Sequence, residues 1–458
     1  MVRRIAILTL TSALALACNK DKGEGGGEKG GEGKGEGKVT AETGTAGEKS
    51  GAGAAGIRIG VLTDMSGLYA DLSGEGSVEA AKMAVEEAGG KVAGKTIEVI
   101  SADHRNKPDV GSAVARRWLE NEGVDVIVDV PTSSVALAVN ELTRAQNKVF
   151  IASGPASADL TGKACSPNTV HWTYDTWALA NGTGGEVVRS GGKTWFFITA
   201  DYAFGQALER DVTKVVTEAG GKVLGGVKHP LNNTDFSSFL MQAQGSKAQV
   251  IGLANAGGDT INTIKQAAEF GLGKSGQKLA GLLVFISDVH ALGLDVAGGL
   301  MLTTAFYWDH DDGTREWSKK FAARHDGKMP TMVQAGVYAG VRHYLKAVAE
   351  AGDESDGRKV VEAMKKIPTD DPLFGKGTID ANGRKRHPVY LYQVKTKDES
   401  KAPWDYYKLV REIPADQAFN DPAKTGCSLV AGAAAPADAK GAADAKGDAK
   451  GDAKSGTK

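Results

Sequence analysis

The chain has 458 residues, and its 55 lysines and arginines nearly balance its 56 aspartates and glutamates, for a net charge of −1. This balance provides no basic surface in bulk, so the composition argues against a nucleic-acid-binding protein. After the N-terminus, no apolar run is long enough to predict a membrane span. The composition is that of a soluble globular protein.

The first 17 residues have the layout of a secretory signal peptide, with a short basic head and an apolar stretch at 5–17. This stretch is too short to span a bilayer as a mature helix. The sequence "ALAC" at 15–18 resembles the lipobox of bacterial lipoproteins, in which the cysteine is acylated and becomes the new N-terminus. The resemblance implies a lipid anchor at Cys18. The alternative is an ordinary signal peptide followed by a chance cysteine.

Two segments lack the apolar residues that a packed core requires. Residues 18–56 are almost all Gly, Glu, Lys, Ala, Thr and Ser, and residues 431–458 repeat Ala-Asp-Ala-Lys-Gly. Neither segment can bury enough apolar surface to offset the entropy of ordering, so we expect a disordered linker and a disordered tail. The folded part is then about 57–430, a length suited to two domains.

The number of cysteines, three, bears on whether the chain contains a disulfide. If Cys18 carries lipid, Cys165 and Cys427 remain, and an even remainder in an oxidising compartment favours a disulfide between them. Such a bond would join the middle of the chain to the end of the folded region. The alternative is two free buried thiols.

Strands and helices alternate in two blocks along the folded part. In the first block we expect strands at 57–65, 95–103, 124–130 and 148–153, and helices at 76–90, 109–121 and 134–146. In the second block we expect strands at 193–201, 222–230, 248–255 and 282–288, and helices at 207–221, 235–246 and 260–272. Two such blocks predict an α/β fold with two doubly wound parallel sheets.

Ligands of open α/β sheets bind outside the carboxyl ends of the strands, so the loops that follow the strands are candidate binding loops. They carry hydroxyls, glycines and helix N-termini in "PTSS" (131–134), "SGPAS" (153–157) and "NAGGD" (255–259). Exposed N–H groups and helix dipoles favour an anion, whereas Asp288 after the last strand could hold a cation. The loops therefore suit a small zwitterion. The alternative is that these residues are ordinary helix caps.

The motifs "LTDMSGLYADLSGEGSVEAAKMAVEEAGG", "SGPASADLT" and "ADYAFG", in this order, resemble the periplasmic receptors for branched-chain amino acids, the Leu/Ile/Val-binding subunits of ABC importers. The resemblance implies a type I periplasmic binding protein fold, in which three crossings join two lobes that close on a ligand. It implies a first lobe from 57–172 and 306–385 and a second lobe from 173–305 and 386–430.

The resemblance also implies a set of ligand-binding residues. The family positions that bind the ligand carboxylate correspond to Thr132 with its neighbour Ser133 and to the turn at 153–157. The family position that binds the ligand ammonium corresponds to Asp288. Tyr174 and Trp177 lie at the first crossing and are candidate cleft walls, with packing between the lobes as the alternative. The full set is Thr132, Ser133, Ser153, Gly154, Ala156, Ser157, Tyr174, Tyr202, Phe204, Asn255 and Asp288.

Several positions depart from the family pattern, which leaves the ligand open. Phe204 keeps the aromatic ring of the family but loses its hydroxyl, and Leu72 and Ala256 stand where the family has aromatic residues. The carboxylate end of the site is kept, while the amine and side-chain ends are changed. An amino acid and an aromatic acid are therefore rival ligands.

No motif predicts catalysis. The eight histidines show no paired metal spacing, and there is no Gly-x-Ser-x-Gly elbow. We therefore expect no enzyme, no cofactor and no metal. We expect a solute receptor in the bacterial cell envelope, in the periplasm or on the outer face of the cytoplasmic membrane. It would be held by lipid and deliver a small carboxylate-bearing solute to an ABC permease. The alternative partner is a membrane signalling protein, for which the same fold would act as a sensor.

Overall fold

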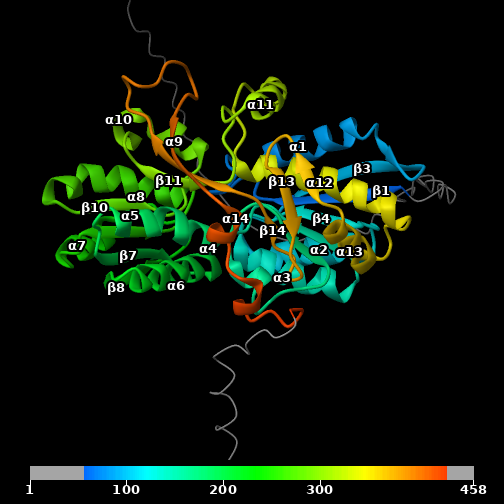
Figure 1. Cartoon of the computed structure of the whole chain (residues 1–458), viewed down its shortest axis with the longest axis horizontal. Helices are drawn as coiled ribbons and strands as arrows, with labels where there is room; N and C mark the ends of the chain where they lie inside the picture. The colour runs from blue at the N-terminus through cyan, green and yellow to red at the C-terminus, as the bar shows by residue number, and fades with distance from the viewer. Residues whose placement is uncertain (1–55, 431–458) are drawn as a thin grey trace, which may run out of the picture. The chain divides into compact units, whose positions relative to one another are not determined.

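The computed structural model describes residues 56–430, apart from the side chains of residues 274 and 275 (Figure 1). All of these residues lie in one structural unit of the chain. The predicted signal peptide, the lipid anchor at Cys18, nearly all of the predicted linker and the predicted tail at 431–458 lie outside the described residues.

The first sheet has six strands in the order β2-β3-β1-β4-β5-β6. Its strands are β1 (Ile57–Thr63), β2 (Lys91–Val92), β3 (Lys95–Asp103), β4 (Val126–Asp129), β5 (Val149–Ala152) and β6 (Thr169–His171). All neighbours pair in parallel except the short β2–β3 hairpin. The central strands are fully buried, which explains why their sequences are continuous apolar runs rather than alternating ones. The four predicted strands of this block are confirmed.

Helices cover both faces of this sheet. One face is covered by α1 (Gly74–Glu87), α12 (Met332–Ala351) and α13 (Gly357–Lys366), and the other by α2 (Pro108–Glu120) and α3 (Ser133–Ala145). Figure 1 shows α1 on one side of β4, with α2 and α3 on the other. Trp118 packs on the second face and is 1% exposed. We call this sheet and its helices the first lobe.

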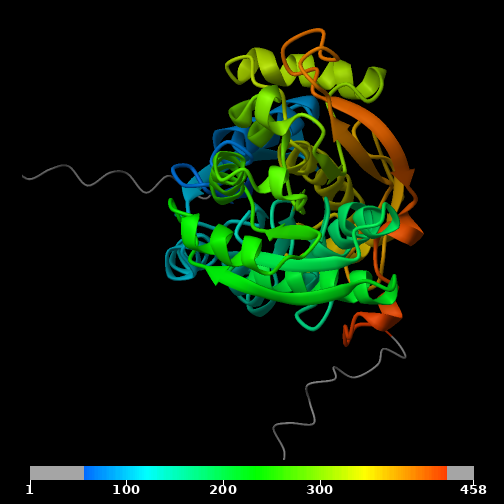
Figure 2. The same ribbon diagram turned by 90° about the vertical axis from the view of Figure 1, so that its left-hand side faces the viewer.

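The second sheet has four parallel strands in the order β10-β9-β7-β8. They are β7 (Thr194–Ala200), β8 (Lys222–His229), β9 (Val250–Ala254) and β10 (Lys278–Gly281). The helices between them are α6 (Ala203–Glu218), α7 (Ser237–Gly245) and α8 (Gly258–Glu269). We call this sheet and its helices the second lobe, and its green strands face the viewer in Figure 2.

One predicted strand is wrong. The apolar run at 282–288 does not extend the sheet, because β10 ends at Gly281 and the helix α9 (Ile286–Leu292) begins five residues later. The apolar side chains of this run are buried in irregular backbone, which a hydrophobic pattern cannot distinguish from a buried strand. Asp288 therefore lies in the first turn of a helix rather than at the end of a strand.

Two small antiparallel sheets complete the strands. One consists of β11 (Met301–Thr304), β15 (Val389–Val394) and β16 (Tyr407–Ile413), and the other of β12 (Thr369–Asp371), β13 (Gly375–Ile379) and β14 (Lys385–Arg386). The remaining helices are α4 (Thr176–Leu179), α5 (Gly185–Arg189), α10 (Leu294–Ala297), α11 (Asp312–Arg324) and α14 (Ala415–Ala418), with a π-helical turn at Ala180–Gly184 and 3-10 turns at Ala158–Thr161, Leu272–Ser275 and Pro422–Lys424.

The fold class predicts that the chain passes between the lobes three times. We expect the first passage after β6 and, given the order of elements, the second between β11 and α11 and the third between β14 and β15. None of the helices between residues 56 and 430 combines the length and apolar character that a bilayer crossing demands.

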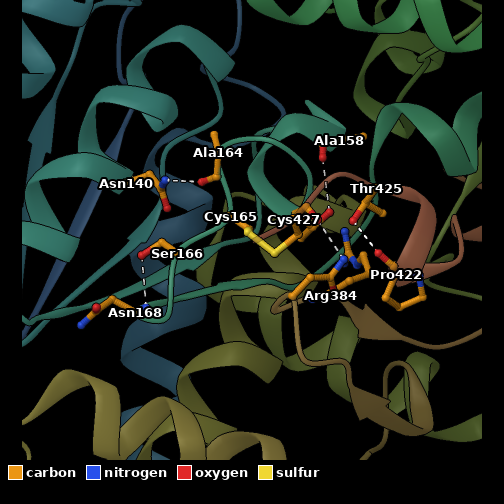
Figure 3. The surroundings of a disulfide bond; sticks show 12 residues. Asn140, Ala158, Ala164, Cys165, Ser166, Asn168, Arg384, Pro422, Thr425 and Cys427 are labelled. Carbon is orange, nitrogen blue, oxygen red and sulfur yellow. Dashed lines mark hydrogen bonds between the residues drawn. A yellow bond between two sulfur atoms is a disulfide. The ribbon is translucent and has the colours of Figure 1, made fainter. Parts of the chain in front are cut away.

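The structure joins Cys165 and Cys427 in a disulfide, the pairing that the cysteine count favours (Figure 3). Both cysteines are buried, and 262 positions separate them in sequence. Beside the bond, the Asn140 side chain donates a hydrogen bond of 2.8 Å to the carbonyl of Ala164. The disulfide thus ties the end of the described chain to the segment that precedes β6.

Candidate ligand-binding cleft

A small cavity lies where loops of the two lobes meet. Its volume is about 10 Å³, close to the space that a single water needs, so the lobes or their side chains must move to admit a larger molecule. Its wall contains no acidic or basic side chain. The wall residues are Tyr69, Leu72, Pro131, Gly154, Ala156, Tyr174, Tyr202, Phe204, Ala256, Leu283 and Phe285.

Two hydrogen bonds join the lobes at one side of this cavity. The hydroxyl oxygens of Tyr69 and Tyr202 lie 2.5 Å apart, and the Gly258 amide donates to the carbonyl of Leu68 at 3.2 Å. Burial raises the pKa of both tyrosines well above the usual value, so both phenols are neutral and one donates to the other. The lobes are therefore closed on each other in this structure.

The loop that carries Tyr69 is shaped by a buried carboxylate. Asp64 follows β1 and accepts hydrogen bonds from the amides of Gly67 (2.8 Å) and Tyr69 (2.9 Å) and from the side chain of Asn106 (2.6 Å). These bonds fix a tight turn at the carboxyl end of the strand. The turn directs Tyr69 toward the second lobe, where its hydroxyl meets Tyr202.

Tyr174, from the first crossing, closes another part of the wall. Its hydroxyl donates a hydrogen bond of 2.7 Å to the carbonyl of Gly154. Its ring packs edge-on against Phe285, with 6.3 Å between ring centroids. A side chain at position 154 would place its Cβ 2.6 Å from the Asp129 carboxylate and 2.7 Å from Cα of Pro131, so glycine is required there.

The predicted hydroxyl residues of the first lobe are buried, and three of them form hydrogen bonds with neighbouring groups. Thr132 donates to the side chain of Asn106, and Ser133 accepts from the amide of Ser157 at 3.3 Å. Ser157 in turn accepts from the amide of Asp159 at 3.4 Å. Gly154 and Ala156, from the same turn, line the cavity, whereas Thr132, Ser133, Ser153 and Ser157 lie outside its wall. The hydrogen bonds of Thr132, Ser133 and Ser157 hold the turns that surround the cavity.

A buried carboxyl that the sequence reasoning missed lies beneath this turn. Asp129 ends β4, is 0% exposed and accepts a hydrogen bond of 2.6 Å from Ser73. Burial raises its pKa to about 6. Asp129 and Val130 both have positive φ, at 78° and 58°, which is strained for a β-branched residue such as Val130. The "DVP" sequence at a strand end is the only signal that marked this position.

In the second lobe, Phe204 and Tyr202 line the cavity and Asn255 does not. The Asn255 amide nitrogen lies 3.2 Å from both His229 and Thr263, and its oxygen accepts a hydrogen bond of 2.7 Å from Thr260. All of its polar groups are therefore occupied within the second lobe. As the structure places it, Asn255 supports the loop after β9.

Asp288 also lies outside the cavity wall. Its carboxylate accepts a hydrogen bond of 2.9 Å from the amide of Phe285, which is the residue before its helix and part of the wall. Burial raises the pKa of Asp288 to about 7. The carboxyl is thus a helix cap directly behind the wall.

The structure adds wall residues that were not among the predicted ligand-binding set. Leu72 and Ala256 were noted as positions where the family's aromatic residues are replaced, and both line the cavity. Tyr69, Pro131, Leu283 and Phe285 were missed. Tyr69 follows the first strand, where a binding loop is expected, but Leu283 and Phe285 were hidden within the wrongly predicted strand.

Comparison with known proteins identifies the fold. The family model described as "Periplasmic binding protein" matches residues 56–400. The chain belongs to this family. Periplasmic binding proteins are non-enzymatic components of transport systems, which agrees with the prediction that this chain is no enzyme. Membership also places the folded chain outside the cytoplasm and makes it a solute-binding protein of the ABC-transporter type.

Three solved periplasmic binding proteins resemble this one over nearly their whole lengths. One from Burkholderia mallei is 53% identical, with a TM-score of 0.80, and the match covers 82% of this chain and 100% of that one. A branched-chain amino acid ABC transporter ligand-binding protein from Burkholderia xenovorans is 38% identical, with a TM-score of 0.73 and coverage of 81% and 99%. A solute-binding protein from Rhodopseudomonas palustris, in complex with 3,4-dihydroxybenzoic acid, is 26% identical, with a TM-score of 0.69 and coverage of 78% and 97%.

Proposed function

We propose that this periplasmic binding protein captures a small aromatic carboxylic acid between its lobes and delivers it to an ABC permease. The observation that carries the proposal is the cavity wall, which has five aromatic rings and no charged side chain. The five rings belong to Tyr69, Tyr174, Tyr202, Phe204 and Phe285. Aromatic walls bind flat rings by edge and face contacts, whereas an ammonium group would lack a partner there.

The carboxylate of the solute would lie at the first lobe. The helix α3 begins at Ser133, two residues after the wall residue Pro131, and its first amides have no partner within the helix. Helix N-termini favour anions through these amides and through the helix dipole. When the lobes part, Thr132 and Ser133 and the turn at 153–157 would become accessible to the solute. Closure would then bury the solute against the rings.

The R. palustris relative supports this ligand class, because it was solved with 3,4-dihydroxybenzoic acid. A branched-chain amino acid is the second candidate. It is favoured by the carboxyl of Asp288 directly behind Phe285 and by the description of the B. xenovorans relative. An ammonium group would need Phe285 to move aside so that it could reach this carboxyl.

The N-terminal sequence supports a proposal about how the receptor is attached to a membrane and which partner it meets. We propose that Cys18 carries lipid and holds the protein at a membrane of the envelope, with residues 19–56 as a tether. The partner would then be a permease in the cytoplasmic membrane. A signalling protein is the alternative partner, and a permease gene next to the gene of this chain would favour transport.

Thermal unfolding of the full chain with a panel of solutes tests the ligand class. The panel contains benzoate, 4-hydroxybenzoate, 3,4-dihydroxybenzoate, leucine, isoleucine, valine and glutamate. A ligand at about one hundred times its Kd adds roughly 2.7 kcal/mol to the free energy of unfolding, which raises Tm by several degrees. We expect this rise with aromatic carboxylates.

In the variant Phe204→Ala, the solute should no longer raise Tm. In Phe270→Ala it should still raise Tm, because Phe270 is 40% exposed and lies outside the cavity wall. A rise with leucine, isoleucine or valine alone would establish the second candidate. A rise that survives Phe204→Ala would overturn the site.

A further inference from the structure

A second, larger cavity lies away from the candidate cleft. Its volume is about 430 Å³, within the range of small-molecule sites. Its walls come from five segments: the turn at 158–163, the first crossing at 175–177, α6, the segment at 382–384 and the C-terminal segment at 420–426. The first of these belongs to the first lobe and α6 to the second, so the cavity is shared between the lobes.

The walls of this cavity carry an excess of positive charge, with five basic and three acidic side chains. The basic residues are Lys163, Arg210, Lys214, Arg384 and Lys424, and the acidic ones are Asp159, Asp175 and Asp211.

The three carboxylates are already occupied by neighbouring groups. Arg210 of α6 bridges Asp159 of the first lobe (3.1 Å) and Asp211 of its own helix (2.9 Å). Lys163 also contacts Asp159, at 3.3 Å. Asp175 caps α4 by accepting a hydrogen bond of 2.8 Å from the amide of Ala178, and the Arg384 guanidinium lies 3.7 Å from its carboxylate. An anion in the cavity would therefore meet carboxylates whose charge is neutralised.

Two cations keep capacity for a further anion. Lys214 lies over the ring of Trp177, with its Nζ 4.8 Å from the ring centroid, and forms no ion pair with a described residue. Arg384 is 2% exposed and donates to the carbonyls of Tyr174 and Lys385, while its Nη2 has no partner among residues 56–430. Burial lowers the pKa of Arg384 to about 10, so it remains charged at neutral pH. Figure 3 shows Arg384 and Thr425 among the surroundings of the disulfide.

From this arrangement we propose that the cavity is a second binding site, for a small multivalent oxyanion such as phosphate or a di- or tricarboxylate. The anion pairs with Lys214 of the second lobe and with Lys163 of the first, because the Lys163 side chain is 59% exposed and its single ion pair, with Asp159 at 3.3 Å, leaves ammonium donors for an anion. The buried charge of Arg384 adds to the attraction. Thr161, Asn382 and Thr425 provide polar groups for its remaining oxygens. Because the anion contacts both lobes, it stabilises the closed arrangement.

Calorimetric titration of the full chain with inorganic phosphate and with citrate tests the site, without any solute in the cleft. The variants are Lys163→Gln and Lys214→Gln, and the control is Lys265→Gln, an exposed lysine of α8 outside the cavity. We expect saturable binding that each cavity variant weakens at least fivefold and that the control leaves unchanged. Sodium chloride of equal ionic strength should bind at least tenfold more weakly, because a single negative charge gains less from two cations than a multivalent oxyanion does.

Equal binding by the cavity variants and the control would overturn the proposal, as would no saturable binding of either anion to the unaltered chain. The outcome is independent of the proposed function, because the titration contains no aromatic acid. Conversely, the Phe204→Ala variant should bind phosphate and citrate normally even where it has lost the response to aromatic carboxylates.

Discussion

Tyr69 and Tyr202 bring their hydroxyl oxygens to 2.5 Å across the two lobes, and both side chains line the candidate cleft. One tyrosine comes from the loop after β1 and the other immediately precedes α6. The same pair therefore lines the cavity and forms a hydrogen bond between the lobes. This arrangement couples the contents of the cleft to closure, and it can be tested residue by residue.

Removal of one hydroxyl of this pair should weaken solute binding without unfolding the chain. The variant Tyr69→Phe loses one interlobe hydrogen bond, worth about 1 kcal/mol, so the Kd for the acid found in the thermal panel should rise roughly fivefold. Isothermal titration calorimetry measures this. Tyr344→Phe is the matched control, because the buried Tyr344 hydroxyl has no partner among the described residues. Equal Kd values for the two variants would contradict the role of the pair in closure.

The variant Gly257→Ala should prevent full closure. A Cβ at this position would lie 2.4 Å from the carbonyl oxygen of Leu68, on the opposite lobe, so the lobes could not approach as they do here. We expect the solute Kd to rise at least tenfold, because about 1.4 kcal/mol of closure energy is a factor of ten.

The control for this variant is Gly220→Ala, at a glycine that also has positive φ but has open space around its Cβ position. Both substitutions strain the backbone, and only Gly257→Ala adds a clash between the lobes. If both variants lose affinity equally, backbone strain rather than blocked closure is responsible.

Substitution of Asp288 separates the two candidate ligand classes. The variant Asp288→Asn keeps an acceptor for the Phe285 amide but removes the negative charge. Binding of an aromatic acid should change less than twofold, whereas binding of an amino acid that uses this carboxylate should fall at least a hundredfold. The same panel of solutes, titrated into both proteins, gives the answer. A large loss of aromatic acid binding would place Asp288 in direct contact with the solute.

The same variant should alter how stability depends on pH. Burial raises the pKa of Asp288 to about 7, while an unfolded aspartate ionises near pH ~4. The folded chain thus holds the proton more tightly, and the contribution of Asp288 to stability decreases as the pH rises from about 4 through 7. Relative to the wild type, Asp288→Asn should gain Tm between pH 5 and pH 8. Melting curves of both proteins over this range test the prediction, and a constant difference in Tm would refute the shift.

Reduction of the disulfide should destabilise the chain. The bond between Cys165 and Cys427 closes a very long loop, and loss of a native disulfide typically costs about 2–5 kcal/mol. Urea unfolding with and without dithiothreitol measures the change in the free energy of unfolding. The double variant Cys165→Ser/Cys427→Ser should be equally destabilised and insensitive to the reductant. Identical unfolding of the oxidised and reduced wild type would show that the bond contributes nothing.

Much of the fold follows from local patterns. The strands β1, β4 and β5 are short apolar runs with polar loops after them, and β7 and β9 repeat the arrangement, so their type and order could be predicted without a structure. The run at 282–288, which is not a strand, shows the limit of prediction from apolar patterns. An apolar pattern reports burial, and both a sheet and an irregular wall can bury the same side chains.

The sequence by itself determined the fold class, the order of the two blocks and the loops in which the cleft lies, because periodicity and strand-end chemistry are local properties. Only the tertiary structure decided which residues of those loops meet. The polar groups of Asn255 and Asp288 bind residues of their own lobe instead of facing the cavity. The structure also brings Tyr69 to Tyr202 and places Asp129 under the turn at Gly154. The contacts of Tyr69 with Tyr202 and of Asp129 with the turn at Gly154 join residues that lie far apart in the chain, and they depend on how the elements pack, which no local pattern encodes.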